Sequence, residues 1–131
     1  MKPRKFSLKK RLLSFGFAFS GLKTLIKEEH NARIHLVAAI CVISASIIFR
    51  INVYEWIAII LVIGFVFAME IVNTAIENIA NYLSIDIDVR IKKIKDLAAA
   101  ATLVSAIVAL IVGLIIFLPK IATLIIQKTI N

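Results

Sequence analysis

The chain has 131 residues, of which 61% are hydrophobic and 18% are charged, and its mean hydropathy is +0.98. The length fits one domain, and the apolar fraction excludes an ordinary soluble protein and indicates a membrane protein. The net charge of +8 raises the question of a nucleic-acid partner, but the placement of the charges along the chain fits a membrane topology better, so no such partner is expected.

Basic and apolar residues are interleaved in the first part of the chain. Residues 1–28 hold eight of the sixteen Lys and Arg residues, with Phe and Leu side chains between them. This pattern is typical of an amphipathic helix that lies in the membrane interface rather than crossing the bilayer. Within this expected surface helix, Lys10 and Arg11 are suited to attract anionic lipid headgroups.

Three apolar segments follow, each expected to be a transmembrane helix: residues 34–49, 55–82 and 96–118. The second, at about 40 Å, is longer than a hydrocarbon core of about 30 Å and should project on one side. Residues 84–95 are expected to form a polar loop or a surface helix. The third helix should end at Pro119, because proline lacks an N–H and disrupts a helix, which leaves residues 121–131 as an apolar tail. The expected fold is all-α, with residues 1–131 as a single membrane-embedded domain.

The distribution of Lys and Arg predicts the orientation of these helices. Nine of these residues lie between the N-terminus and Arg33, and four lie between residues 82 and 96. The other side of the membrane has three, at Arg50, Lys120 and Lys128. Because positive charge accumulates on the cytoplasmic side, the N-terminus and the 82–96 connection are expected there.

A polar stripe interrupts the second apolar segment. Glu70, Asn73 and Glu77 are spaced at i, i+3 and i+7, which places all three on one face of a helix. An ionisable group inside a membrane costs at least a few kcal/mol and by default suggests a functional site. The alternative is a stripe that joins helices by hydrogen bonds, which explains Asn73 more readily than two glutamates.

Charged residues from three segments are expected at one depth in the membrane. Glu70 lies about 21 Å along the helix from Trp56, so Glu77 falls near the cytoplasmic interface, where Lys95 and Glu29 also lie. Carboxylates can hold Mg²⁺ together with phosphates, a lysine can neutralise phosphate oxygens, and a desolvated carboxylate can act as a base toward a lipid hydroxyl. This grouping predicts Mg²⁺-dependent chemistry at the inner membrane face. It would be sufficient for phosphoryl transfer, which needs mainly positioning and charge neutralisation.

The chain resembles the prokaryotic diacylglycerol kinase family, small three-span kinases that include undecaprenol kinases. The residues that carry the resemblance are Glu70-x-x-Asn73-Thr74-Ala75-Ile76-Glu77, then Lys95-Asp96-x-Ala-Ala-Ala, Glu29-x-Asn31-x-x-x-His35, and Gly113 to Lys120. The last two resemble the undecaprenol kinase branch. The similarity implies an ATP- and Mg²⁺-dependent lipid kinase in the bacterial inner membrane, assembled as a homotrimer with active sites shared between subunits.

The resemblance also implies roles for the polar residues of the second helix and for Glu29, which precedes the first. Glu70 would be the general base, and Asn73 would position the reacting groups and contact ATP. Glu29 and Glu77 would hold the Mg²⁺ that accompanies ATP. From its place at the start of the first span, and not from the resemblance, His35 is expected either to hydrogen-bond a lipid headgroup, to help orient Glu29, or to be an ordinary interfacial histidine without a role in the reaction, and the last is favoured.

The remaining roles concern the nucleotide. Lys95 would contact the phosphates and Asp96 the nucleoside. Lys10, with Arg11 beside it, aligns with an arginine that contacts ATP in the family, but a lysine does not reproduce bidentate guanidinium contacts. Asn81 stands where the family usually has an aspartate, which removes a negative charge near the metal and is expected either to weaken metal binding or to alter its stoichiometry.

The sequence therefore predicts a kinase that phosphorylates undecaprenol at the cytoplasmic membrane face. A diacylglycerol kinase of the same fold is the alternative, because both lipids present a primary hydroxyl. Two other classes are a small oligomeric cation channel, which would place acids across the whole bilayer, and an assembly subunit without chemistry, which would leave Glu70 without a purpose. The acids of this chain cluster at one depth, which favours the kinase.

Overall fold

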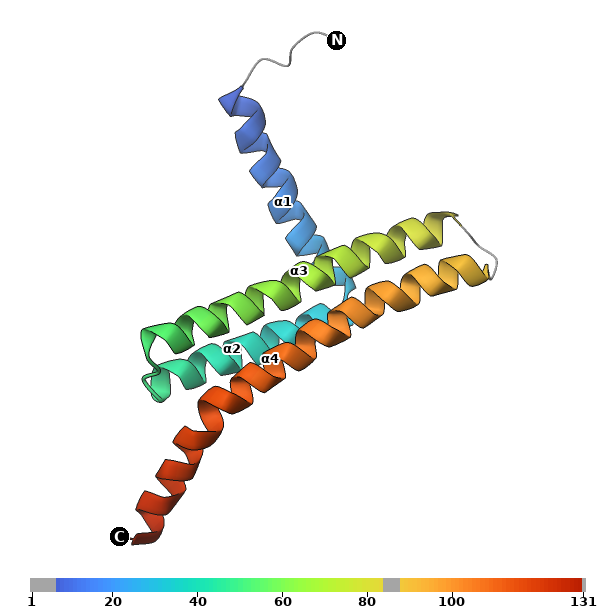
Figure 1. The fold of residues 1–131 in the computed structure, drawn as a ribbon. Helices are drawn as coiled ribbons and strands as arrows, with labels where there is room; N and C mark the ends of the chain where they lie inside the picture. Colours follow the sequence, from blue (N-terminus) through green and yellow to red (C-terminus); the bar gives the residue numbers. More distant parts are fainter. Residues whose placement is uncertain (1–6, 84–87, 131) are drawn as a thin grey trace.

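The computed structural model describes residues 7–83 and 88–130, and within these ranges all regular structure is helical. The helices are α1 (Leu8–Glu28), α2 (His30–Ile48), α3 (Val53–Leu83) and α4 (Val89–Ile130). Figure 1 shows α2, α3 and α4 running side by side, while α1 leaves the bundle at a steep angle. The all-helical fold is confirmed. The first residues of the expected surface helix, 1–6, lie outside the described part of the chain.

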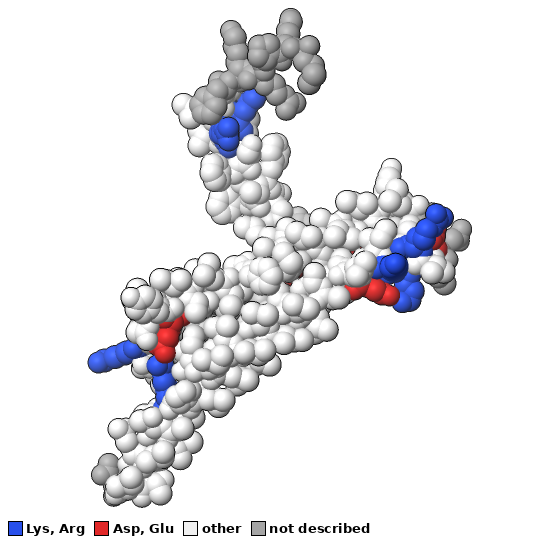
Figure 2. Space-filling view, in the orientation of Figure 1, with Lys and Arg blue, Asp and Glu red and all other residues white. Residues whose placement is uncertain are grey.

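Three of these helices, α2, α3 and α4, are long and apolar enough to cross a membrane. The shortest, α2, has 19 residues and therefore a length of about 28 Å, close to the hydrocarbon thickness. Charged side chains gather at the two ends of the bundle in Figure 2 and leave an uncharged band between them. This is the pattern of a multi-pass membrane protein, and the expectation of three helices that can cross a membrane is confirmed. The first of them begins four residues earlier than expected, at His30 instead of residue 34.

A single extended residue separates α1 from α2. Glu29 has φ −95° and ψ 119°, and its N–H donates to the Leu25 carbonyl at 2.9 Å. The Arg33 guanidinium then reaches back along the chain and donates to the carbonyls of Ile26 and Lys27 at 3.1 and 3.0 Å. A cation is favourable at a helix C-terminus, where carbonyls lack partners. Arg33 therefore fixes the end of α1 and, with it, the corner that presents Glu29.

A tight connection joins α2 to α3. The N–H of Arg50 donates to the Ile47 carbonyl and that of Ile51 to the Ser46 carbonyl, each at 3.2 Å, which is the Schellman arrangement that closes a helix. Arg50 has φ 50°, a left-handed conformation that costs a residue with a Cβ roughly 1–2 kcal/mol. The sharp turn between α2 and α3 therefore contains one residue, Arg50, in a strained backbone conformation.

Asn52 begins α3 with a reciprocal cap. Its Oδ1 accepts from the N–H groups of Tyr54 and Glu55 at 2.9 and 3.0 Å, and Glu55 Oε2 accepts from the Asn52 N–H at 2.9 Å. We expect Asn52→Ala to lower the free energy of unfolding by about 1 kcal/mol, because the first turn loses its acceptor. Thermal unfolding in detergent measures the loss, and Asn52→Asp should restore most of it. Equal stability of the alanine variant would contradict this role.

The first turn of α3 is joined to the last third of α4. Lys120 Nζ donates to Glu55 Oε1 at 2.9 Å, and both side chains are largely covered. Beside this ion pair, the rings of Phe49 and Phe117 lie 6.0 Å apart between centroids, a favourable tilted contact. These contacts hold the end of the bundle that lies opposite the carboxylate stripe.

The expected limits of the third span, 96–118, are wrong at both ends, because α4 runs from Val89 to Ile130. It starts early because Asp88 caps it, with Oδ1 accepting from the Arg90 N–H at 2.7 Å. It continues through Pro119 because a proline in a helix removes one donor and bends the axis without necessarily ending it. Figure 1 shows α4 turning away from α2 and α3 in its last third. Residues 121–130 are thus helical, while residues 84–87 of the expected loop lie outside the described ranges.

Candidate active site

The polar stripe of α3 is buried within a single chain. The exposed fractions of Glu70, Asn73 and Thr74 are 2%, 8% and 7%, and Glu77 is half-buried one turn further on. Among the described side chains, Glu70 Oε1, Asn73 Oδ1 and Thr74 Oγ1 are buried without a hydrogen-bond partner. Buried polar atoms are nearly always paired, so three unpaired atoms within five residues require an explanation. A stripe that only joined the helices of one chain would have its partners in place. Asn73 Oδ1 and Thr74 Oγ1 lack them, so these two oxygens can accept or share a hydrogen bond with a ligand or another chain.

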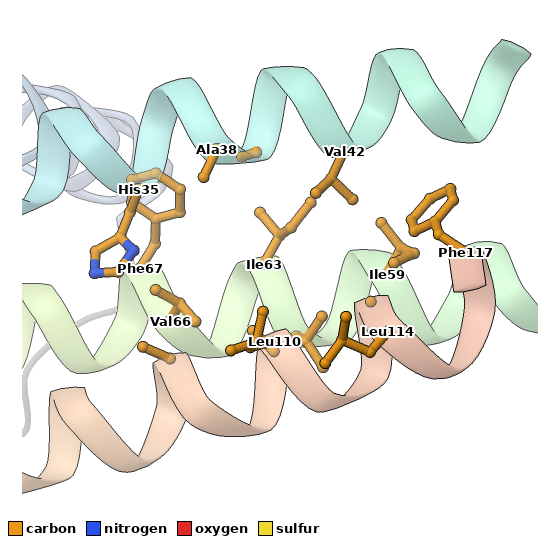
Figure 3. Close-up of a pocket in the computed structure, with 15 residues that line it drawn as sticks. His35, Ala38, Val42, Ile59, Ile63, Val66, Phe67, Leu110, Leu114 and Phe117 are labelled. Atoms are coloured by element: carbon orange, nitrogen blue, oxygen red, sulfur yellow. The ribbon is translucent and has the colours of Figure 1, made fainter. Parts of the chain in front are cut away.

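His35 of α2 is the residue nearest to the buried carboxylate. Its Nε2 lies 3.2 Å from Glu70 Oε1, although the direction is not that of a hydrogen bond, as the unpaired state of that oxygen shows. In Figure 3 the imidazole projects from α2 toward α3, beside Phe67. The sequence placed His35 near a headgroup or Glu29 and missed this contact. The signal was available, because His35 and Glu70 are polar groups inside neighbouring spans and each needs a partner there.

The two expected metal ligands lie within the electrostatic range of the same carboxylate. Glu29 and Glu77 are half-buried, and the charges of both act on Glu70. Glu29 owes its position to the corner between α1 and α2, and Glu77 lies two helical turns from Glu70. In the described ranges, no three His, Cys, Asp or Glu side chains form a ready metal site. Two carboxylates suit Mg²⁺, which commonly takes one or two protein carboxylates and completes its shell with phosphate and water.

Lys95 and Asp96 are consecutive in the chain but point to different surroundings. Lys95 Nζ donates to Asn81 Oδ1 at 3.0 Å, which joins α4 to α3. Asp96 pairs with Lys92 at 2.6 Å on the exposed side of α4. Of the two, the structure brings Lys95 toward α3 and leaves Asp96 facing outward.

Lys10 and Arg11 lie in the first turns of α1. Figure 1 shows that end of α1 far from the other three helices. The structure of a single chain therefore does not bring these two residues to Glu70, and their predicted contact with ATP stays a prediction.

Comparison with known proteins identifies the family. The family model described as prokaryotic diacylglycerol kinase matches residues 16–117, which include the carboxylate stripe, His35 and Lys95. The chain belongs to the prokaryotic diacylglycerol kinase family. It is similar to the undecaprenol kinase of Bacillus subtilis, with 34% identity over 91% of this chain and 97% of that protein. It is also similar to a diacylglycerol kinase of a Synechocystis species, with 32% identity over 86% of this chain and 65% of that protein.

Membership of this kinase family indicates which kind of reaction the buried polar residues of α3 would serve. The site combines a deep carboxylate in contact with an imidazole, two shallower carboxylates and one lysine, supplied by α2, α3, α4 and the α1–α2 corner. These are the groups that proton removal and phosphate neutralisation need. The predicted kinase family is confirmed, and the individual roles of the residues are proposals.

Proposed function

We propose that this protein transfers the γ-phosphate of ATP to the hydroxyl of undecaprenol at the cytoplasmic face of the bacterial inner membrane. The observation that carries the proposal is the Glu70 carboxylate, which is 2% exposed and has an unpaired oxygen beside His35. A lipid hydroxyl presented from the bilayer would supply the missing hydrogen bond. The similarity to an undecaprenol kinase over nearly the full length of both chains supports that lipid as the acceptor.

In this reaction Glu70 acts on the acceptor. Its carboxylate accepts the proton of the lipid hydroxyl while the hydroxyl oxygen forms a bond to the γ-phosphorus of ATP. The bond between that phosphorus and the bridging oxygen breaks, and ADP leaves with the electron pair. His35, 3.2 Å from Glu70, restricts the orientation of the carboxylate. Burial excludes water, which would otherwise compete with the lipid for the phosphate.

Other residues bind the nucleotide. Glu29 and Glu77 would hold Mg²⁺, which suits their carboxylate oxygens and would neutralise charge on the ATP phosphates. Asn73 has an unpaired Oδ1 and positions the reacting groups. Lys95 contacts the phosphates after exchanging its hydrogen bond with Asn81. Asp96 contacts the nucleoside from the outer side of α4.

The roles proposed for Lys10 and Arg11 are compatible with a homotrimer in which the subunits share active sites, which we also propose. Because α1 carries them away from the bundle of its own chain (Figure 1), they can reach ATP only at the site of another subunit or after α1 changes position. We place α1 in the cytoplasmic interface, where its basic residues meet anionic headgroups.

Diacylglycerol is the second candidate acceptor, and the observation in its favour is the similarity to a diacylglycerol kinase. Purified protein in mixed micelles, given radiolabelled ATP, Mg²⁺ and equal amounts of both lipids, distinguishes the two. We expect the label in undecaprenyl phosphate. A label that appears in phosphatidic acid instead would change the substrate and leave the roles of the site residues in place, whereas no labelled lipid would refute the kinase function.

Asn81 offers a further prediction. Because Asn81 Oδ1 accepts from Lys95 at 3.0 Å, Asn81→Asp would replace a hydrogen bond between the ammonium group and a neutral amide by an ion pair and hold Lys95 away from phosphate. We expect KM for ATP to rise severalfold, with a smaller effect at high salt. Steady-state kinetics at saturating lipid measures this. A lower Mg²⁺ requirement with unchanged KM for ATP would show that residue 81 acts on the metal, as the sequence suggested.

A further inference from the structure

The last part of α4 extends beyond the rest of the helical bundle. Lys120 marks the end of the bundle, because its Nζ donates to Glu55 Oε1 at 2.9 Å in the first turn of α3. α4 nevertheless continues to Ile130, and Figure 1 shows this part turning away from α2 and α3. Residues 121–130, here called the distal segment, are all exposed. They follow the part of the chain that the family model matches, so membership of the family gives them no role.

The level of Lys120 in the membrane follows from the residues around it. Charged side chains gather at this end of the bundle (Figure 2), and α3 begins there with Tyr54 and Trp56, residue types that are enriched at membrane interfaces. Lys120 therefore lies near the membrane surface. The distal segment extends about 15 Å beyond it, whereas the headgroup layer on one side of a bilayer is only about 5–8 Å thick. A helix that continued along the membrane normal would hold its last residues in water.

The distal segment has a polar side and an apolar side. At 3.6 residues per turn, Lys120, Thr123 and Gln127 fall within an arc of about 60° around the helix axis. Ile121 and Ile125 lie on the opposite side of the helix. A short helix with this division suits the surface of a bilayer, because one side is buried among acyl chains while the other side stays hydrated. A helix surrounded by water would instead expose the isoleucines without compensation.

The other polar side chains of the distal segment are also compatible with contact with lipid. Thr129 lies on the apolar side, and its hydroxyl donates to the Ile125 carbonyl at 3.0 Å. Lys128 lies at the border between the two sides. Its methylene groups can cover apolar surface while its ammonium group reaches water. The apolar side of the described segment therefore holds no polar side chain that would lose its hydrogen bonds in lipid.

We propose that the distal segment lies in the plane of the membrane surface and binds the lipid of the leaflet opposite the α1–α2 corner. Ile121 and Ile125 insert among the acyl chains, and Gln127 faces water. The bend after Pro119, seen in Figure 1, is what a change from a crossing to a surface direction requires, and a proline within a helix provides it. A helix that lies across the end of a span opposes movement of α4 along the membrane normal. The proposal goes beyond the kinase function and does not depend on it.

Spin labels on the two sides of the distal segment test this arrangement. Cys41→Ser removes the single native cysteine, and a nitroxide is then attached at Ile125→Cys or at Gln127→Cys. The full chain is reconstituted in vesicles of phosphatidylethanolamine and phosphatidylglycerol. The two positions lie about 160° apart around the helix but only about 3 Å apart along its axis, so each is the matched control of the other. We expect the ratio of accessibility to oxygen over accessibility to a water-soluble nickel chelate to be higher at Ile125 by about fivefold or more.

A third label, at Ile121→Cys, measures the direction of the helix axis. In a helix parallel to the membrane surface, Ile121 and Ile125 lie at the same depth. In a helix along the membrane normal, Ile125 would lie about 6 Å further out than Ile121. The same accessibility ratio reports depth, and a steady decrease from Ile121 to Ile125 would overturn the proposal.

Other arrangements of the distal segment give other patterns. High accessibility to the nickel chelate at both Ile125 and Gln127 would mean that the segment projects into water, and high accessibility to oxygen at both would mean that lipid surrounds it. Low accessibility to both reagents at Ile125, with dipolar broadening between chains, would mean that a second copy of the chain covers the apolar side. Each of these three results would overturn the proposal. The measurement contains neither ATP nor an acceptor lipid, so its outcome is independent of the kinase function.

Discussion

Glu70→Gln is expected to lower the rate of phosphate transfer by about 10³-fold, within the range of about 10²–10⁴ that general base catalysis contributes. The amide keeps the shape of the side chain and its contact with His35 but does not accept the proton of the acceptor. KM for ATP should change little, because Glu70 lies deeper than the groups assigned to the nucleotide. Steady-state transfer to undecaprenol, with ATP binding measured separately, checks both statements.

A second glutamate on the same side of the membrane provides the control. Glu28 is exposed at the end of α1, and Glu28→Gln removes the same charge without touching the buried stripe. Its transfer rate should stay within twofold of the wild type. If Glu70→Gln kept more than a tenth of the wild-type rate while Glu28→Gln was unchanged, Glu70 would not be the base and another group would have to remove the proton.

Glu29→Gln and Glu77→Gln are expected to raise the Mg²⁺ concentration needed for half-maximal transfer by tenfold or more, which corresponds to about 1.4 kcal/mol. Each change removes one of the two carboxylates suited to the metal, and Mg²⁺ prefers charged oxygen ligands. A titration of Mg²⁺ at fixed ATP measures the shift, with Glu28→Gln again as the control. Saturating Mg²⁺ should restore part of the transfer rate of these two variants, whereas it should not restore the rate of Glu70→Gln. An unchanged Mg²⁺ titration in both variants would exclude them as ligands.

The sequence was sufficient for those features that follow from local physical rules. The spacing of Glu70, Asn73 and Glu77 requires a common helical face, and the structure buries Glu70 and Asn73 there and half-buries Glu77. The lengths of the apolar segments predicted three spans, and the second was correct to within two residues at each end. These features depend on residues near one another in the chain.

The features that the sequence did not predict are contacts between separate helices and the continuation of a long helix through a single proline. The expected helix end at Pro119 was wrong because the apolar length of α4 on both sides of the proline maintains the helix through it. The contact between His35 and Glu70 joins residues 35 positions apart, so only the packing of α2 on α3 reveals it. The hydrogen bond from Lys95 to Asn81 likewise depends on how α4 lies against α3.

The distribution of charge also bears on the channel alternative. Glu70 is buried between helices within one chain, and it is the only charged side chain among the buried residues that the structure describes. A cation pore would need polar groups along its whole length. The charges of Glu29 and Glu77 act on Glu70 from the end of the bundle where α1 meets α2, which suits a reaction at one membrane face.

The measurement that most directly tests a lipid kinase site at the cytoplasmic ends of these helices uses sealed membrane vesicles of both orientations. Inside-out and right-side-out vesicles that contain the protein and undecaprenol receive radiolabelled ATP and Mg²⁺ from outside, and the extracted lipids are separated. We predict labelled undecaprenyl phosphate in the inside-out vesicles and almost none in the right-side-out vesicles until these are permeabilised. Label that appears only in intact right-side-out vesicles, or in no lipid from either preparation, would contradict the proposed site.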